Sequence, residues 1–91
     1  MLEFPVFVAI GKAGTRISFP EKTYTKLGEP ERLIFAEEGN RLYFKEDERG
    51  WKCSFRCKRS YIVAVGDRYG EFIGDRELQF DEDGTAFIEK E

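Results

Sequence analysis

Hydrophobic and polar residues alternate along much of this chain, and such alternation predicts β-strands whose two faces meet different surroundings. The longest case is Trp51 to Lys58, WKCSFRCK, where every second residue is apolar and the residues between are Lys, Ser or Arg. We expect one strand here, with the aromatic and cysteine side chains facing inward and a basic outer face. Further strands are predicted at residues 3–10, 15–19, 33–37, 42–45 and 61–65, with a final hairpin at 78–89.

Glycine and proline predict where the chain turns. Gly11 to Gly14 is expected to join the first two strands, because glycine accepts the positive φ angles of tight turns. Glu38-Gly39-Asn40 and Asp83-Gly84 are expected to close two later hairpins tightly. Pro5 predicts that the first strand begins at a sheet edge, since proline has no N–H to donate. The glycine-rich residues 66–77 are predicted to form a loop.

One short helix is predicted from Pro20 to Leu27. Proline is tolerated at the first helical position, Glu21 suits the first turn, and Gly28 follows the last turn. Tyr24 and Leu27 are three residues apart, so we expect them to share the buried face of this helix.

Two parts of the chain resemble each other. The segment LIFAEEGNRLYFKE at 33–46 aligns without a gap with LQFDEDGTAFIEKE at 78–91, with six identical residues. A shorter match joins VFVAIG near the start of the chain to IVAVG in its second half. We interpret the chain as a degenerate tandem duplication of a β-rich unit, with residues 1–46 as the first copy and 51–91 as the second.

Composition supports a single β-rich domain. Nine Phe, four Tyr, one Trp and nine Gly in 91 residues favour strands and tight turns over helices, and a chain of this length suits one compact domain. The fold class we expect is mainly β. It is a small antiparallel barrel or sandwich of hairpins, with one short helix near residues 20–27 and an internal pseudo-repeat.

The formal net charge of −3 is unevenly distributed. Residues 1–66 hold twelve Lys and Arg against nine Asp and Glu, which gives +3, and residues 67–91 hold three against nine, which gives −6. Two opposite kinds of partner are therefore open, an acidic one for the first part and a basic one for the second.

The chain carries neither a long apolar run nor the basic start and apolar stretch of a secretion signal, so we expect a cytoplasmic protein that does not insert into a membrane. Cys53 and Cys57 fit that compartment. On one extended strand they would lie about 13 Å apart, too far to bond to each other. We expect both to be reduced and buried.

Catalytic chemistry has little support in the sequence. The chain contains no His, and two cysteines without further ligands do not make a zinc site. Gly11 to Thr15 (GKAGT) lacks the spacing of a phosphate-binding loop. We therefore expect no enzyme, no metal and no cofactor.

The order of a strand, a proline-initiated helix, a connector and a hairpin resembles the AbrB/MazE-like swapped-hairpin family of bacterial DNA-binding domains. The matching segments are RISFP at 16–20, KLG at 26–28, LIF at 33–35 and EGNRL at 38–42. The resemblance implies an interleaved β-barrel, usually built from two chains, in a transcriptional regulator or in the DNA-binding half of an antitoxin. A true duplication would instead let one chain supply both halves of the barrel.

Candidate DNA-binding residues come from two sources. The resemblance implies contacts near the first hairpin, at Lys12 and Arg16 and also at Lys22. The predicted basic strand face adds Lys52, Arg56, Lys58 and Arg59, because cations at alternate positions of a strand can follow the phosphates of a nucleic acid. The same face could also be a plain solvated surface that protects the sheet from aggregation.

An alternative function uses the acidic part of the chain. A small inhibitor or accessory protein of a mobile element could dock on a basic partner protein through this part. The residues concerned would be Asp67, Glu71, Asp75, Asp81, Glu82 and Asp83.

Overall fold

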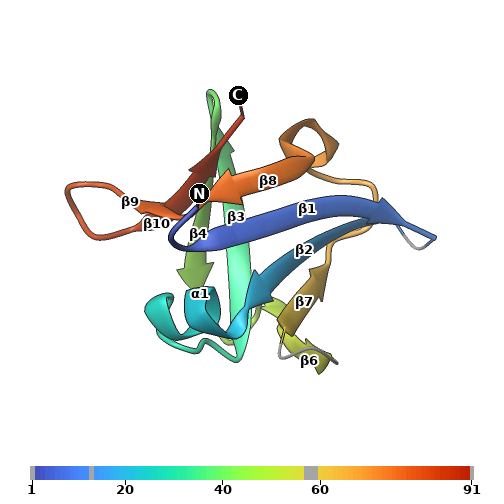
Figure 1. Cartoon of the computed structure of the whole chain (residues 1–91), viewed down its shortest axis with the longest axis horizontal. Helices are drawn as coiled ribbons and strands as arrows, with labels where there is room; N and C mark the ends of the chain where they lie inside the picture. Colours follow the sequence, from blue (N-terminus) through green and yellow to red (C-terminus); the bar gives the residue numbers. More distant parts are fainter. Residues whose placement is uncertain (1, 13, 57–59, 91) are drawn as a thin grey trace.

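The computed structural model describes residues 2–12, 14–56 and 60–90, which form two antiparallel sheets and one short α-helix (Figure 1). The predicted mainly β fold is confirmed. Sheet A has the strand order β6 (Ser54–Arg56), β7 (Ser60–Ala64), β2 (Gly14–Pro20), β1 (Pro5–Gly11) and β8 (Gly74–Glu77). Sheet B has the order β5 (Trp51–Lys52), β3 (Arg32–Glu38), β4 (Arg41–Glu46), β10 (Ala86–Glu89) and β9 (Gln79–Phe80).

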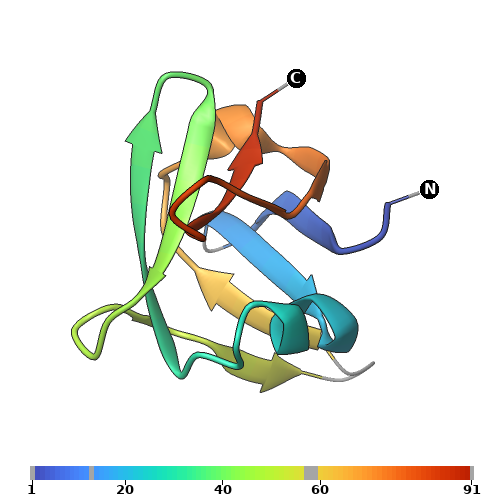
Figure 2. The ribbon, with the colours of Figure 1, turned by 90° about the vertical axis from the view of Figure 1, so that its left-hand side faces the viewer.

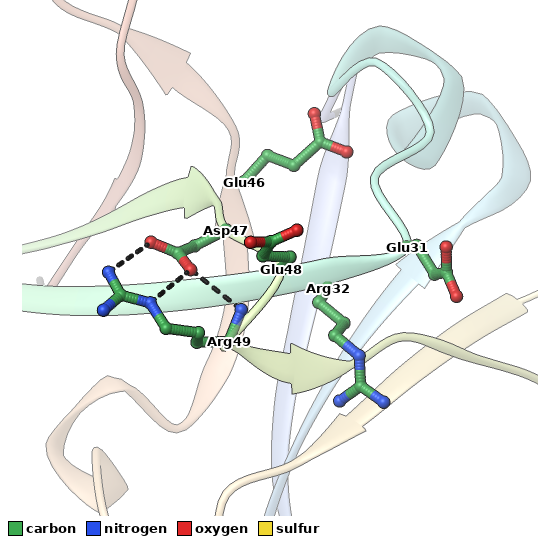
Figure 3. Close-up of a pocket in the computed structure, with 6 residues that line it drawn as sticks. All are labelled: Glu31, Arg32, Glu46, Asp47, Glu48 and Arg49. Atoms are coloured by element: carbon green, nitrogen blue, oxygen red, sulfur yellow. Dashed lines mark hydrogen bonds and ion pairs between the residues drawn. The ribbon is translucent and has the colours of Figure 1, made fainter.

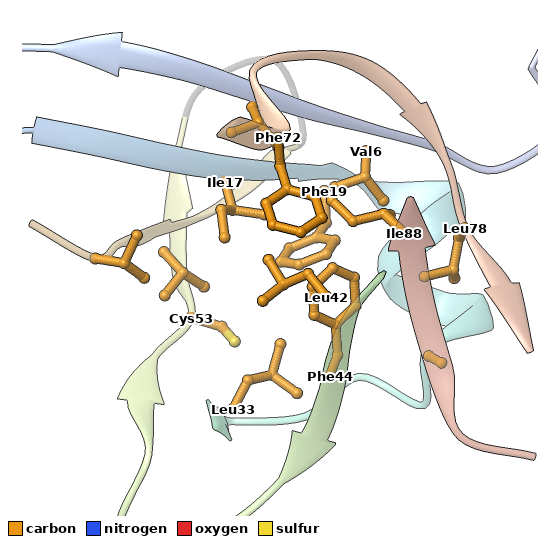
Figure 4. Close-up of a cluster of buried hydrophobic side chains, with 14 of the residues drawn as sticks. Val6, Ile17, Phe19, Leu33, Leu42, Phe44, Cys53, Phe72, Leu78 and Ile88 are labelled. Atoms are coloured by element: carbon orange, nitrogen blue, oxygen red, sulfur yellow. The ribbon is translucent and has the colours of Figure 1, made fainter. Parts of the chain in front are cut away.

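The core lies between the two sheets, whose strands cross in Figure 1. Alternate residues of β1, β2 and β4 are buried, so the period of two in the sequence contributes to both walls of the core. The ring of Phe19 from sheet A meets the ring of Phe44 from sheet B edge-on, with 5.5 Å between centroids. Figure 4 shows how these side chains fill the interior together with Val6, Ile17, Leu33, Leu42, Phe72 and Ile88.

The chain crosses between the sheets three times, once through α1 and its connector and twice at buried corners. Leu78, between β8 and β9, donates its N–H to the carbonyl of Phe4 at 2.9 Å. Cys53, between β5 and β6, donates its N–H to the carbonyl of Glu31 at 2.9 Å. These corners join the edges of the two sheets into a barrel-like sandwich.

The helix α1 (Glu21–Lys26) is one residue shorter at each end than predicted. Its Thr23 hydroxyl donates to the carbonyl of Pro5 at 2.7 Å, and the Tyr24 hydroxyl donates to the carbonyl of Pro30. The Tyr24 ring also stacks on Tyr61 of β7, with 3.6 Å between centroids. Side-chain contacts with β1, with β7 and with the connector before β3 therefore hold this short helix in place.

Two predictions about sheet A are wrong. Residues 66–77 are not only a loop, because they contain the 3₁₀-helix η2 (Gly70–Phe72) and the strand β8. Strand β1 is not at an edge, since β8 pairs with it from Pro5 to Val8. The carboxylate of Glu77 in β8 accepts the N–H groups of Glu3 and Phe4 at 2.8 and 2.9 Å, beside the position where proline has no N–H to donate.

The hairpins differ in how they turn. Gly39, with a φ of 61°, and Asn40 close the predicted tight turn between β3 and β4. The predicted tight turn at Asp83-Gly84 is wrong, because residues 81–85 form a longer loop. Asp81 closes it, with its N–H bonded to the carbonyl of Thr85 at 3.0 Å and its carboxylate accepting two loop N–H groups.

The two segments of the predicted repeat both form hairpins of sheet B, and these pair through β4 and β10. Their common origin stays a prediction. No helix within the described ranges is long and apolar enough to cross a membrane.

Candidate functional site

The predicted basic strand from Trp51 to Lys58 does not exist as one strand. Its first two residues form β5 of sheet B, and residues 54–56 form β6 of sheet A, with the buried Cys53 at the corner between them. Alternation in the sequence cannot reveal such a corner, because the apolar residue that fills it keeps the period of two. The expected single basic face is therefore wrong, and Trp51 and Phe55, expected inside, are 38% and 58% exposed.

The predicted DNA-binding cations are spread over the molecule. Lys12 lies at the turn after β1, whereas Arg16 on β2 and Arg56 on β6 belong to sheet A. Arg56 and Arg16 pair with opposite ends of β7, which places their backbones about 13 Å apart along the strand direction alone. Lys22 on α1 lies over the ring of Phe4, with 5.4 Å from Nζ to the centroid. Lys58 and Arg59 lie outside the described residues, as does Cys57.

The predicted acidic residues divide into two groups at different ends of the molecule in Figure 1. Asp67, Glu71 and Asp75 lie around η2 and β8, whereas Asp81, Glu82 and Asp83 lie in the loop between β9 and β10. Glu71 pairs with Lys90 at 2.6 Å, and the Asp81 carboxylate holds its own loop. The structure therefore does not bring these six residues together.

Three cations are neighbours on the outer face of sheet B, and we call them the cationic cluster: Arg32, Lys45 and Lys52. Lys52 on β5 lies directly opposite Arg32 on β3, and Lys45 on β4 lies opposite Ile34, the next outward residue of β3. Opposed residues on one face have Cβ atoms about 5 Å apart and diagonal ones about 7 to 8 Å, so Arg32 has both lysines as neighbours, one on each side of β3. None of the three forms an ion pair within the described part of the chain.

Two surface hollows adjoin the cationic cluster and share Ile34. The tryptophan hollow has a volume of about 390 Å³ and is lined by Arg32, Ile34, Arg49, Gly50, Trp51 and Lys52. The tyrosine hollow has a volume of about 280 Å³ and is lined by Ile34, Ala36, Glu38, Tyr43, Lys45, Asp81 and Thr85. Trp51 pairs with the buried Leu33, so its side chain leaves β5 on the other face from Lys52. In the tyrosine hollow, Lys45 has the carboxylates of Glu38 and Asp81 as neighbours in the lining.

A third hollow, the acidic hollow, borders the cluster at the β4–β5 loop. It has a volume of about 740 Å³ and is lined by Glu31, Arg32, Glu46, Asp47, Glu48 and Arg49 (Figure 3). Backbone and side-chain N–H groups of Arg49 lower the pKa of the Asp47 carboxyl. In Figure 3 the Arg32 guanidinium points away from Glu46 and Asp47, and its Nη1 donates to the carbonyl of Gly50 at 3.1 Å.

Figure 2 shows β3 and β4 beside each other as one wall of the molecule, with the β4–β5 loop below them. Arg32 and Lys45 on these strands were not predicted as DNA-binding residues. Their outward direction could have been inferred from the sequence, because Arg32 and Ile34 flank the buried Leu33, and Tyr43 and Lys45 flank the buried Phe44. Finding the cluster also required the register between three strands.

Groups with strongly shifted pKa values lie in the core and offer no nucleophile. Burial raises the pKa of the Cys53 thiol to about 11, and burial raises the pKa of Tyr24 to about 12. Cys53 is a free thiol, as predicted, and stays protonated at neutral pH. No cluster of metal-ligating side chains occurs among the residues that the structure describes.

Comparisons of this chain with family models, with curated proteins and with solved structures give no significant match.

Proposed function

We propose that this protein binds DNA, in a regulatory and non-catalytic role, through the cationic cluster on the outer face of sheet B. The observation that carries the proposal is the register that sets Lys52 opposite Arg32 and Lys45 diagonal to it. Like charges so close together repel one another, and a row of phosphates removes that repulsion while releasing counterions.

The chemistry of the cluster suits phosphate. Arginine offers a planar fork of N–H donors, and the two lysines offer compact charges that can follow a flexible backbone. The Arg32 guanidinium has one N–H engaged by the carbonyl of Gly50, which orients the side chain and leaves its other donors for a ligand. A partner protein has less support, because the acidic residues proposed for it lie in two separate groups and two of the six are occupied by internal contacts.

The test is fluorescence anisotropy of a labelled DNA at several salt concentrations, with two triple variants. Arg32→Ala, Lys45→Ala and Lys52→Ala together remove the cluster. Lys12→Ala, Arg16→Ala and Lys22→Ala together form the matched control, since they remove the same charge from exposed residues elsewhere. Binding by the natural protein should weaken as salt rises, and the cluster variant should lose about 2 to 3 from the slope of log K against log salt.

The control triple should keep most of the affinity and of the salt slope. Loss of binding in the control but not in the cluster variant would place the DNA at the first hairpin and helix, and would reject the cluster. Absence of binding by the natural protein at low salt would reject DNA binding itself.

A further inference from the structure

We propose that two copies of this chain associate through the outer face of sheet A, the surface formed by the outward residues of β1, β2 and β7. The association does not depend on the proposed function. It differs from the interleaved barrel that the family resemblance implies, because one chain here supplies every strand of both sheets. The inference starts from an apolar face that neither α1 nor η2 covers.

Both helices pack toward the core rather than over this face. Tyr24 of α1 and Phe72 of η2 are buried members of the core between the sheets. In Figure 1 sheet A lies in front of sheet B, and neither α1 nor η2 crosses its strands. Phe7 and Ala9 of β1 are exposed, so the face is open to solvent in the single chain.

The centre of this face is poor in charge. Residues that alternate with the buried residues of β1, β2 and β7 point outward. The register sets them in two rows, with Phe7, Ser18 and Ile62 in one and Ala9, Arg16 and Ala64 in the other. Four of these six residues are apolar and one is charged, whereas 36% of the whole chain is charged. An exposed apolar area with few charges is typical of an interaction surface.

Arg16 does not interrupt this apolar area. A Cβ atom at Gly11 would lie 2.9 Å from Nε of Arg16, so the side chain occupies the space that the glycine leaves beside it. It leans toward the end of the first hairpin, away from the row that contains Phe7.

The charges around the face suit a second copy of the same chain. Asp75 of β8 lies opposite Phe7, on the other side of β1 from Arg16, which places the two charged residues about 12 Å apart at the backbone. Neither forms an ion pair within the described chain. A two-fold axis that lies in the interface and crosses β1 between Phe7 and Ala9 exchanges the two positions. Arg16 of each copy then meets Asp75 of the other, and the two Phe7 rings meet near the centre.

The size of the face predicts a weak pair. Five strands about 4.8 Å apart, with three outward residues on each of the longer ones, give an area of roughly 400 to 500 Å² per copy. An interface of this size is at the lower end for specific complexes, so we expect a dissociation constant of about 10 to 100 µM. At about 1 µM, as in an unfolding experiment, nearly all copies are single.

The pair leaves the cationic cluster free. Figure 2 shows the two sheets on opposite sides of the core, so the outer face of β3 and β4 points away from sheet A. Association through sheet A therefore does not compete with DNA binding through sheet B.

The test is sedimentation equilibrium of the protein without DNA, from about 5 to about 500 µM. Phe7→Ser should weaken the association by about tenfold or more, since each pair loses two rings from its centre. Ile34→Ser is the matched control, because Ile34 on the outer face of sheet B is also 37% exposed and neither change alters the charge. The control should associate as the natural protein does.

A charge exchange tests the two-fold arrangement. Arg16→Asp and Asp75→Arg should each weaken the association by about threefold or more, because each sets like charges opposite one another twice. The double variant should restore the association to within about twofold of the natural protein, since the ion pairs form again with their signs reversed.

A natural protein that remains single at about 500 µM would overturn the inference. Loss of association in Ile34→Ser but not in Phe7→Ser would also overturn it, and so would a double exchange that fails to restore association. Association by a protein that binds no DNA at low salt would reject the proposed function and leave this inference standing.

Discussion

The outer faces of the two sheets are built by the same alternation but carry different surfaces. Sheet A presents Phe7 and Ala9 on β1 beside Ser18 and Arg16 on β2, so its described centre holds a single cation among apolar and neutral side chains. Sheet B groups three cations within neighbouring register positions. The two faces differ because the register between strands decides which charged residues become neighbours. The residues of any one strand do not reveal that register.

The largest effect should come from the contact that joins the two sheets. Phe19→Ala removes a fully buried ring that packs on Phe44, and we expect it to lower the free energy of unfolding by about 3–5 kcal/mol. Phe7→Ala removes the same group from the outer face of sheet A, where the ring is 37% exposed, and should cost about 1 kcal/mol or less. Urea unfolding of both variants measures the difference. Equal losses would mean that the outer face of sheet A is covered in solution.

An intermediate effect should follow from disturbing the register of sheet B alone. A Cβ atom at Gly50 would lie 2.4 Å from the carbonyl oxygen of Leu33, so Gly50→Ala must push the start of β5 away from β3. We expect a loss of about 1–3 kcal/mol in stability and several-fold weaker DNA binding, because Lys52 then moves away from Arg32.

Gly70→Ala is the control for this change, since a Cβ atom there meets nothing within 4 Å. It should alter neither stability nor DNA binding appreciably. Gly50→Ala with unchanged DNA binding would show that the cluster does not depend on the pairing of β5 with β3.

The smallest effect should come from the ion pairs that tie η2 to sheet B. Lys90 contacts Glu71 at 2.6 Å and Glu37 at 3.1 Å, and the hydrogen bond from Lys90 lowers the pKa of Glu71 below its ordinary value of 4.5. A carboxyl with a lowered pKa in the folded state contributes stability above its unfolded pKa, and this contribution disappears as the pH falls through the folded pKa.

Glu71→Gln should therefore reduce stability slightly at pH 7 and flatten its decline below pH 4.5. Thermal unfolding between pH 7 and pH 3 measures both effects, which should be small because exposed ion pairs are weak. Glu82→Gln is the control, since Glu82 is an exposed loop residue without an ion pair in the described chain. A variant at Glu71 with the same acid profile as this control would contradict the assignment.

Most of the fold could be predicted from the sequence where the signal is local. The helix from Pro20, the first hairpin and the tight turn at Gly39 depend on residues close in the chain, and their predicted positions are close to the observed ones. Strand β8 was missed because Gly-Asp-Arg-Glu carries no apolar alternation, and its place depends on β1, which pairs with it across about seventy residues of chain.

The candidate site was harder to predict for the same reason. Alternation predicted Lys52 as a DNA-binding candidate on a single strand that also held Arg56 and Lys58. The corner at Cys53 separates Lys52 from Arg56 and turns the chain from one sheet to the other. Arg32 and Lys45 were missed because each is an ordinary outward cation within its own strand.

The amino-acid sequence by itself determined that this is a mainly β domain with one short helix, because period-two alternation, glycine turns and a proline-initiated turn of helix act over a few residues. Only the tertiary structure decided where the chain changes sheets and which outward cations become neighbours. Those outcomes depend on the pairing of strands far apart in the chain, and a strand carries the same alternation whichever neighbour it pairs with.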